Sequence, residues 1–502
     1  MHSILVRLRR IISDRTQRTR FSMLEKKVPM LNKYFYLNTI GCQMNVYDSE
    51  QIAARLAALG YQQTGILEIA DLVIVNTCTI RAKAEQKAFS FLGRLAGLKI
   101  KKPGLIIGVG GCVAQQEGAK ILRRVPHVDL VFGTQAIDRL PLLIQKIEDK
   151  RCRIVDVALT EKSSPSGALT DRRLDGSVST FVTIMRGCDN FCTYCVVPHV
   201  RGRETSRHPD RIMEEIRGLV QSGVKEVTLL GQNVNSYGKK EGLCSFPELL
   251  SHVNSIEGLL RIRFTTSHPK DFGNDLINAF KTHEKVCNHI HLPVQSGSNR
   301  ILKRMNRKYS RELYLDKITK LKDTCPGIAI TSDIIVGFPG ETEADFNETM
   351  DLMKMVQFDG LFAFVYSDRP NAPAVQFKNK IIEEEKRKRL QTLLEFQENF
   401  TRMKNQALVG SVQPILIEGI SKKQSSGNFN CPEPIVQWTG RTSTNKIVNF
   451  YHNDNPQSCA DIFPGKIVRT NIEKAYAHSL WGKPVEVKSA TGGLKGEKSY
   501  AA

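Results

Sequence analysis

The sequence has no uninterrupted apolar run of about 18 residues, the length a helix needs to cross a bilayer, which excludes an integral membrane protein. It is also poor in acidic residues: 51 Asp and Glu stand against 72 Lys and Arg, so the formal net charge is +21. This imbalance favours an acidic partner, with nucleic acid ahead of a membrane surface. A basic protein without such a partner is the alternative.

A disulfide scaffold is excluded as well, because twelve cysteines in 502 residues are too dilute to cross-link a chain of this length. No apolar signal-peptide core precedes them, so a reducing compartment is expected, where clustered cysteines serve metal or redox chemistry. Residues 1–32 are predicted to be a disordered basic extension, and their arginines also fit a mitochondrial presequence or sequence upstream of a later start. We predict a cytoplasmic protein, with the mitochondrial matrix as the alternative.

Residues 33–150 alternate between short apolar strands and helical patterns, which is typical of a parallel sheet. These elements are expected at 34–37, 48–59, 71–75, 81–98 and 105–109. A Ser-, Pro- and Gly-rich linker is predicted over 151–179. The first domain is therefore predicted to be an α/β domain with a parallel sheet.

A second alternation over 180–406 predicts a partial or full βα barrel, because six βα units follow one another. Its strands are expected at 181–185, 226–230, 261–265, 289–293, 328–336 and 360–366. After a charged helix the pattern changes, and short β-rich stretches over 407–475 predict a small antiparallel barrel. Residues 476–502 are predicted to be a tail. The fold class is therefore α/β with three domains.

The strongest local motif is C-x3-C-x2-C, formed by Cys188, Cys192 and Cys195 directly after the first strand of the second alternation. In βα barrels this end of a strand carries the chemistry. Three thiolates can bind three irons of a four-iron cluster and leave the fourth iron open to a small chelating molecule. The alternatives are unrelated cysteines or a zinc site, which usually needs four ligands.

Cys42, Cys78 and Cys112 form a second, dispersed set, each directly after a predicted strand of the first domain. The carboxyl ends of parallel strands meet at one edge of a sheet, so the three thiols are expected to lie together. Small neighbours such as Gly41 and Gly111 would let the backbone approach a cluster. A second cluster with one open iron is predicted, and ordinary buried cysteines are the alternative.

The C-x3-C-x2-C motif resembles that of the radical S-adenosylmethionine (SAM) enzymes. The stretches 39–45, 76–84 and 108–117 resemble the three N-terminal motifs of the methylthiotransferases. Gln43-Met44-Asn45 is most similar to the MiaB-type tRNA branch, since the ribosomal-protein branch usually has Pro-Lys-Asn there and the threonylcarbamoyladenosine branch Lys-Val-Asn. The resemblance covers about 34–475, and it identifies 407–475 as similar to a TRAM domain, a small RNA-binding module.

This resemblance implies two 4Fe-4S clusters. Cys188, Cys192 and Cys195 would hold the cluster that binds SAM. Cys42, Cys78 and Cys112 would hold an auxiliary cluster. It implies conversion of N6-isopentenyladenosine at tRNA position 37 to its 2-methylthio form. One SAM methylates the inserted sulfur, and a second supplies a radical that abstracts the adenine C2 hydrogen, which is not acidic. The implied partners are the anticodon arm of tRNA, a reductase or flavodoxin-type electron donor and a sulfur donor. No membrane partner is expected, and the protein is expected to be a monomer.

Other residues are expected near this site, although no catalytic residue is assigned beyond the cluster ligands. Gln232, Asn233 and Gln295 end strands of the second alternation and are predicted to hold SAM or substrate, or else to cap loops. Tyr194 is expected near the adenine by resemblance. The basic stretch 301–308 suits tRNA phosphates or a solvated helix face, and 438–442 and 450–452 suit RNA bases and phosphates.

Three alternative functions differ from this one in their chemistry. The nearest is a sister methylthiotransferase that acts on threonylcarbamoyladenosine in tRNA or on a ribosomal-protein aspartate. The second is another radical enzyme whose auxiliary cluster only relays electrons. The third is a non-catalytic RNA-binding iron–sulfur protein, which the presence of six motif cysteines argues against.

Overall fold

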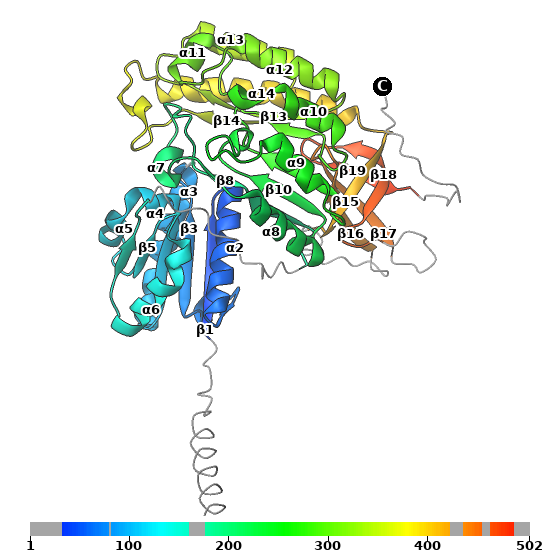
Figure 1. The fold of residues 1–502 in the computed structure, drawn as a ribbon. Helices are drawn as coiled ribbons and strands as arrows, with labels where there is room; N and C mark the ends of the chain where they lie inside the picture. Colours follow the sequence, from blue (N-terminus) through cyan, green and yellow to red (C-terminus); the bar gives the residue numbers. More distant parts are fainter. Residues whose placement is uncertain (1–32, 80–81, 160–175, 422–434, 454–461, 486–502) are drawn as a thin grey trace, which may run out of the picture.

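The computed structural model describes residues 33–79, 82–159, 176–421, 435–453 and 462–485. An N-terminal α/β layer, a central βα barrel and a C-terminal β-barrel follow one another along the chain (Figure 1). The predicted extension 1–32, most of the predicted linker and the end of the tail lie outside the described residues. None of the described helices combines the length and the apolarity that a membrane crossing requires.

The N-terminal sheet is parallel throughout, in the order β2-β1-β3-β4-β5-β6. Its strands are β1 (Lys33–Ile40), β2 (Tyr61–Gln63), β3 (Leu72–Thr77), β4 (Ile106–Gly111), β5 (Leu130–Phe132) and β6 (Ile154–Asp156). The central strands β3 and β4 are buried along their whole length. Helices cover both faces, which explains why these strands are continuously apolar.

Each face of this sheet has its own apolar core. Helices α2 (Gln43–Ala58) and α6 (Leu140–Lys150) pack through Leu56 and Ile144 on one face. Helices α3 (Ala82–Lys101) and α5 (Ala119–Arg124) pack on the other, through side chains such as Leu95. The short helix α4 (Cys112–Glu117) starts directly at the end of β4.

Two predicted boundaries in this region are wrong. The helix predicted from residue 48 begins at Gln43, because Cys42 already has the extended backbone of an N-cap residue. The linker predicted from residue 151 is shorter, since β6 pairs with β5 as the edge strand of the sheet. A three-residue strand carries too little periodicity to be read from the sequence.

The central domain is a partial barrel made of two parallel three-stranded sheets, β7-β10-β11 and β12-β13-β14. The strands are β7 (Ser179–Thr183), β10 (Glu226–Leu230), β11 (Arg261–Thr265), β12 (His289–His291), β13 (Ala329–Val336) and β14 (Gly360–Val365). An isolated bridge pairs Ile262 of β11 with Val286, three residues before β12. The partial barrel predicted from the sequence is therefore confirmed.

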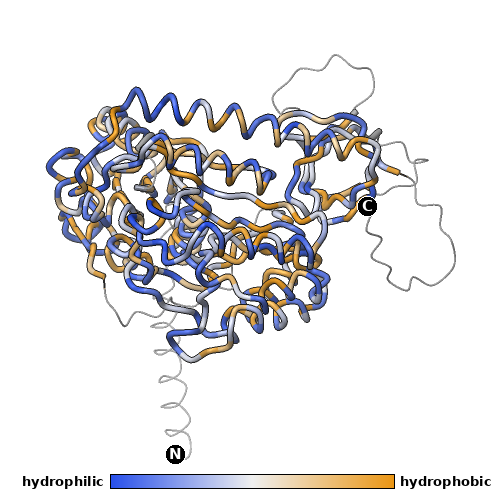
Figure 2. The backbone as a smooth tube through the Cα atoms, turned by 90° about the horizontal axis from the view of Figure 1, so that it is seen from above, coloured by the Kyte–Doolittle hydropathy of each residue, from blue (hydrophilic) through white to orange (hydrophobic). Residues whose placement is uncertain are grey.

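Helices cover the outside of this barrel. They are α8 (Pro209–Gln221), α9 (Phe246–Asn254), α10 (Asn274–Thr282), α11 (Asn299–Arg304), α12 (Arg311–Thr324), α13 (Glu343–Val356) and α14 (Glu383–Gln406). A single large core lies between strands and helices, with Ile290, Ile334 and Leu393 fully buried in it. The long helix α14 is largely hydrophilic and leads to the C-terminal barrel (Figure 2).

The C-terminal domain is a closed barrel in the order β15-β16-β17-β19-β18. Its strands are β15 (Val412–Ile420), β16 (Ile435–Arg441), β17 (Ile447–Asn453), β18 (Ile467–Ala475) and β19 (Leu480–Pro484). All pairs are antiparallel except β17 with β19, which run parallel and close the barrel. The predicted tail therefore starts too early, because β19 belongs to the barrel. The predicted fold class is confirmed, and the remaining domain boundaries stay predictions.

Two arginines of β11 attach the C-terminal barrel to the central one. Arg261 donates to the carbonyl oxygens of Arg441 at 2.6 Å and Pro414 at 2.9 Å. Arg263 donates to the carbonyl of Thr442 at 2.7 Å and pairs with Glu226 at 3.0 Å. Since both side chains are buried, these contacts hold the two domains in one fixed arrangement.

Candidate functional site

The loop that carries Cys188, Cys192 and Cys195 leaves the barrel through a tight turn at Gly187. A Cβ atom there would lie 2.0 Å from the carbonyl oxygen of Arg203, and the backbone φ is +75°, so this position requires glycine. The side-chain oxygen of Gln232 accepts a hydrogen bond from the Gly187 amide at 2.5 Å. Gln232, predicted to hold SAM or substrate, thus supports the cysteine loop from the end of β10.

A buried arginine lies under this loop. Arg307 is 4% exposed, and its guanidinium lies 3.5 Å from the sulfur of Cys192 and 3.3 Å from the hydroxyl of Tyr194. It also donates to the Pro293 carbonyl at 2.7 Å and to the Tyr309 hydroxyl at 3.0 Å. All four partners are neutral while Cys192 is a thiol. A thiolate at Cys192 would therefore balance the positive charge of Arg307.

The thiols of Cys188 and Cys195 keep their protons more strongly than a free cysteine does. Burial raises the pKa of Cys188 to about 11 and that of Cys195 to about 12. Thiolates are the form that binds iron, so the binding of a cation has to compensate their desolvation. The positive charge of Arg307 supplies part of that compensation at Cys192.

Cys42, Cys78 and Cys112 lie at the carboxyl ends of three adjacent strands. Ile40, Thr77 and Gly111 are register partners across β1, β3 and β4, and each of the three cysteines follows one of them by one or two residues. Cys42 precedes α2, and Cys112 opens α4. The dispersed set of the sequence therefore meets at one edge of the sheet.

The backbone around these cysteines approaches unusually closely. A Cβ atom on Gly41 would lie 2.8 Å from the Cβ of Cys78 and 2.3 Å from the side-chain oxygen of Asn45. Asn45 in turn donates to the side-chain oxygen of Asn76 at 3.2 Å and to the Thr77 carbonyl at 3.1 Å. Asn45 and Asn76 thus tie the start of α2, which follows β1, to the end of β3. The sequence contains both asparagines in its motifs but does not reveal their pairing.

The electrostatics at this sheet edge differ from those of the loop that carries Cys188, Cys192 and Cys195. The Cys78 thiol donates a hydrogen bond to Cys42, and this contact, opposed by burial and helped by Arg201, lowers the pKa of Cys42 to about 6. Burial raises the pKa of Cys112, and Arg201 opposes that rise through its charge and a hydrogen bond. Arg201 forms an ion pair with Asp48 at 2.7 Å, and both side chains are buried. Sequence reasoning missed Arg201 and Asp48.

Neither set converges on one point: among the described residues, no three His, Cys, Asp or Glu side chains are placed to hold a single metal ion. A four-iron cube differs from a single ion, because each thiolate binds a different iron at a different corner. Three thiolates in each set suit such a cluster in their chemistry, whereas a structural zinc site usually has four protein ligands.

Several buried polar atoms at the same end of the barrel have no partner among the described residues. They follow β10, β11 and β12, and they are Asn235 Oδ1, Ser267 Oγ, His268 Nε2 and Gln295 Oε1. Burial lowers the pKa of His268 to about 2, and its Nδ1 accepts from the Lys270 amide, so Nε2 carries the proton. Unpaired buried polar atoms from three consecutive strand ends indicate a polar ligand there.

Gln295 and Asn233, both predicted to hold SAM or substrate, differ in whether their side chains already have hydrogen-bond partners. Gln295 has a left-handed backbone with φ +73°, and its side-chain oxygen is among the unpartnered atoms. Asn233 donates to Asp271 at 2.8 Å and accepts from the His268 amide at 3.1 Å. Both polar groups of Asn233 are thus occupied, and it positions the loops after β10 and β11.

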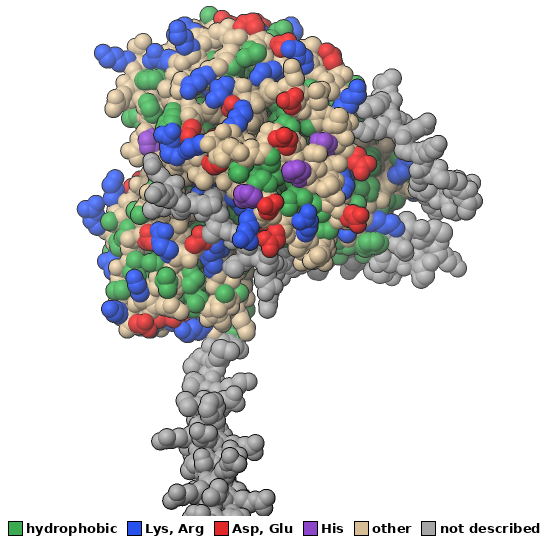
Figure 3. All heavy atoms as spheres, viewed as in Figure 1, with side chains coloured by type: hydrophobic (Ala, Val, Ile, Leu, Met, Phe, Trp, Pro, Cys, Tyr) green, Lys and Arg blue, Asp and Glu red, His purple; other side chains and the backbone are tan. Residues whose placement is uncertain are grey.

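The basic stretch 301–308 does not act as one surface. Arg307 is buried under the cysteine loop, which corrects its expected role at tRNA phosphates, and Arg304 stacks over Phe377 at 4.8 Å. Lys303 and Lys308 line a pocket of about 340 Å³. Lys and Arg side chains are spread over the face formed by α11 to α13 (Figure 3).

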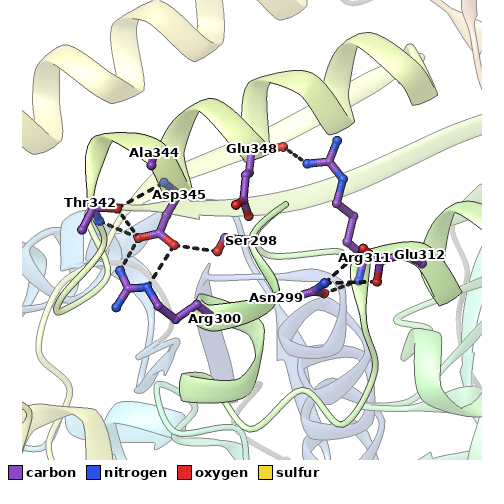
Figure 4. Close-up of a pocket in the computed structure, with 9 residues that line it drawn as sticks. All are labelled: Ser298, Asn299, Arg300, Arg311, Glu312, Thr342, Ala344, Asp345 and Glu348. Atoms are coloured by element: carbon purple, nitrogen blue, oxygen red, sulfur yellow. Dashed lines mark hydrogen bonds and ion pairs between the residues drawn. The ribbon is translucent and has the colours of Figure 1, made fainter.

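A larger pocket of about 660 Å³ lies between the starts of α11, α12 and α13. Its arginines are already engaged: Arg300 points to Asp345, and Arg311 points to the backbone carbonyl of Glu348 (Figure 4). Asn299 hydrogen-bonds Glu312 at 3.1 Å. Cations that are paired within the protein offer little to a phosphate, so this pocket stabilises the helix ends.

In the C-terminal barrel only part of the expected RNA surface is exposed. Phe450 belongs to the barrel core, and Arg441 is paired with Glu418 at 2.8 Å. Tyr451 is half exposed and packs edge-to-face on Trp481, with ring centroids 4.8 Å apart. The side chain of His452 lies outside the described residues.

Comparisons with known proteins bear on both cysteine sets. The model of Uncharacterized protein family UPF0004 matches residues 34–133, and that of the Radical SAM superfamily matches residues 182–353. Each matched segment contains one set of three cysteines.

The chain is also similar to curated proteins over most of its length. It is 55% identical over 461 residues to the tRNA-2-methylthio-N(6)-dimethylallyladenosine synthase of Desulfosudis oleivorans, covering 92% of this chain and 98% of that protein. The enzyme of the same name from Syntrophus aciditrophicus is 52% identical over 90% of this chain and 94% of that protein. Among solved structures, the radical S-adenosylmethionine methyltransferase TsrM from Kitasatospora setae matches 68% of this chain and 75% of its own chain. The TM-score is 0.50 and the sequence identity is 14%, so this match shows the fold alone.

Proposed function

Because the chain belongs to the family of tRNA-2-methylthio-N(6)-dimethylallyladenosine synthases, it is a radical SAM enzyme of tRNA modification, and we propose that it converts N6-isopentenyladenosine at tRNA position 37 to its 2-methylthio form. The observation that carries the proposal is the presence of two separate three-cysteine sets, each of which would leave one iron of a cluster open. Such a pair suits a reaction that needs both a radical source and a sulfur carrier.

For the radical source we propose Cys188, Cys192 and Cys195 as the ligands of a 4Fe-4S cluster that chelates SAM. When bound, this pair would supply a 5′-deoxyadenosyl radical. The chain itself holds the loop: Gln232 fixes the Gly187 amide, and Arg307 offsets negative charge at Cys192. An uncompensated buried cation beside the thiols supports an anionic group at this position.

For SAM we propose the unpartnered polar atoms at the strand ends. Its ammonium, carboxylate and ribose hydroxyls need both donors and acceptors, and this edge supplies both. Gln295 Oε1 is a free acceptor, and His268 Nε2 is a free donor. Tyr194 would pack beside the adenine, with its hydroxyl held by Arg307.

For the sulfur carrier we propose an auxiliary 4Fe-4S cluster on Cys42, Cys78 and Cys112. The close backbone packing at Gly41 and the lowered pKa of Cys42 support thiolate ligation at this edge. The sulfur to be transferred would occupy the open iron. The chain orients the site through Asn45 and Asn76.

We place the target base inside the barrel, against Phe362. The neighbours Leu361 and Ala363 pack on the core under α14, so by strand alternation Phe362 faces the barrel interior. It is 53% exposed, although it lies in the middle of β14, and His291 packs edge-to-face on it at 6.0 Å. An exposed aromatic ring on the inward face of β14, the edge strand of its sheet, suits stacking with an extruded base.

The remaining parts of the proposal concern partners and place. The half-exposed Tyr451 and the partly buried Trp481 on which it packs would contact the anticodon arm by stacking. An electron donor of the flavodoxin or reductase type and a sulfur donor are required by the chemistry, and the enzyme would act as a monomer. Since the compared relatives come from bacteria, we propose that it acts in the cytoplasm.

The test is iron and acid-labile sulfide per chain after anaerobic reconstitution, with nucleoside analysis of tRNA after turnover. About eight irons are expected for the wild type and about four for a Cys42/Cys78/Cys112→Ala variant. About four irons in both proteins would overturn the auxiliary cluster. Product on tRNA with threonylcarbamoyladenosine, and none on tRNA with isopentenyladenosine, would instead establish the sister activity.

A further inference from the structure

Arg201 joins the two halves of the proposed active site. It ends α7 (Val197–Arg201), six residues after Cys195, so it belongs to the segment that carries the radical-cluster ligands. Its guanidinium nevertheless contacts Asp48 of α2 in the N-terminal domain at 2.7 Å. With side chains only 8% and 9% exposed, this ion pair is shielded from solvent on both sides.

The same guanidinium lies against the auxiliary cysteines. Arg201 donates a hydrogen bond to Cys112, and its charge also acts on Cys42. Cys112 packs directly on Val196 and Val200 of the same segment, and Thr134 fixes that segment by donating to the Val200 carbonyl at 2.7 Å. The negative charge of Asp48 acts on Cys112 as well, in the opposite sense. One positive and one negative side chain are thus held beside the same sulfur.

Fixed charges and hydrogen bonds to ligand sulfurs set the reduction potential of an iron–sulfur cluster. A reduced cluster carries one more negative charge, so a nearby cation favours the reduced form and a nearby anion favours the oxidised form. In a buried site these effects are weakly screened. Arg201 and Asp48 are therefore placed to act in opposite directions.

We propose that Arg201 is a positioning residue for the auxiliary cluster: it orients Cys112 and raises the cluster's reduction potential, and Asp48 limits that rise. This inference rests on the proposed function, because it presupposes a cluster on Cys42, Cys78 and Cys112. A purely structural ion pair between the domains makes a different prediction, since removal of either partner would then have the same consequence.

The test compares the two halves of the ion pair by their sign. Potentials are measured by EPR-monitored redox titration of the reconstituted full-length chain, in which Cys188, Cys192 and Cys195 are alanine so that only the auxiliary cluster contributes. Arg201→Gln is expected to shift the potential to more negative values, and Asp48→Asn to more positive values. Arg201→Lys keeps the charge and should leave the potential close to the parent value.

Matched measurements separate this effect from damage to the fold. Arg139→Gln breaks a partly exposed ion pair with Asp156 in the same domain and should not move the potential. In the holoenzyme, Arg201→Gln should lower methylthio product by about 10- to 100-fold, as loss of a ligand-orienting partner does, while SAM cleavage is kept. If the Arg201→Gln variant loses iron, the Asp48→Asn variant alone tests the inference: a shift of the potential to more positive values supports it, and any other result overturns it.

The outcomes distinguish this inference from the function beneath it. If the parent protein binds no auxiliary cluster, the proposed function fails and Arg201 loses its role with it. If the cluster forms but both substitutions leave its potential unchanged, or shift it in the same direction, the inference about Arg201 is overturned and the proposed function stands.

Discussion

The two cysteine sets solve the same problem in opposite ways. One places Cys188, Cys192 and Cys195 within eight residues of a single loop, whereas the other draws Cys42, Cys78 and Cys112 from three strand ends of a parallel sheet. The local set depends on one turn at Gly187, and the dispersed set depends on the whole register of the sheet. A local set tolerates change elsewhere in the fold, and a dispersed set does not.

Each set also has one buried arginine, and the two arginines differ in their partners. Arg201 is paired with Asp48, so its charge is compensated inside the protein. Arg307 contacts two tyrosine hydroxyls, the Cys192 thiol and the Pro293 carbonyl, and it forms no ion pair with a carboxylate in the part of the chain that the structure describes. The loop site is therefore electrostatically incomplete without an anion, and the sheet site is not.

The largest expected effect separates the two sets by activity. Replacement of Cys188, Cys192 and Cys195 by alanine should abolish SAM cleavage by the reduced protein, because no ligand of the proposed SAM-binding cluster remains. Replacement of the other three cysteines should keep SAM cleavage and abolish the methylthio product. Chromatographic assay of 5′-deoxyadenosine and of modified nucleosides checks both. Loss of SAM cleavage in both variants would break the comparison, since the sets would then not work separately.

The next effect tests the difference between the arginines. Arg307→Met removes a positive charge that no carboxylate balances, and we expect about 10- to 100-fold less SAM cleavage or iron in the loop cluster. Arg307→Lys should restore part of it, because the charge returns without the planar fork. Lys303→Met, an exposed change in the same stretch, is the control. Equal effects of Arg307→Met and Lys303→Met on iron content would contradict the electrostatic role.

The sequence predicts those parts of the molecule whose signal is local. Residues 226–230 and 261–265 match β10 and β11 to the residue, since β-branched and large apolar residues are concentrated there. Strand β6 has only three residues, and β19 contains a glycine and a proline that weaken its strand pattern, so both depend on pairing with their neighbours. Tertiary pairing, rather than propensity, decides such elements.

The candidate site divides along the same line. The six cysteines stand in motifs, so the sequence alone proposes them. Arg307 lies in a basic stretch that reads as a surface, and nothing local indicates that it is 4% exposed beneath Cys192. Asp48 and Arg201 are 153 residues apart, and only the packing of two domains brings them together. Charge pairs across domains carry no periodicity that a sequence could display.

A smaller effect leaves both cysteine sets intact and changes only the barrel interior. Phe362→Ala should lower product formation by about 5- to 150-fold, the equivalent of the 1–3 kcal/mol that stacking of one base contributes. Phe362→Tyr should keep most activity, because the ring remains. SAM cleavage without tRNA and the iron content should not change. Met355→Ala, at an exposed position of α13, is the control. Unchanged KM and kcat for tRNA in Phe362→Ala would place the base elsewhere.

The smallest effect separates the stability of the fold from the assembly of either cluster. Burial would raise the pKa of Asp345, but hydrogen bonds from Arg300, Ser298 and Thr342 outweigh it and hold this pKa below its ordinary value. Asp345→Asn removes the charge that these donors stabilise. Because Arg300 is half exposed, we expect a loss of only about 1–2 kcal/mol in the free energy of unfolding at pH 7.

The pH dependence gives this last prediction its sign. A carboxyl with a depressed folded-state pKa stabilises the fold above its unfolded value of about 4, and this stabilisation is lost as the pH falls below it. The difference between wild type and Asp345→Asn in urea unfolding should therefore be largest at neutral pH and shrink towards zero in acid. Both clusters should assemble normally at pH 7, since this side chain touches neither cysteine set. A change in iron content would mean that the loop cluster depends on the helix ends of the barrel, and the contrast between a local and a dispersed site would have to be abandoned.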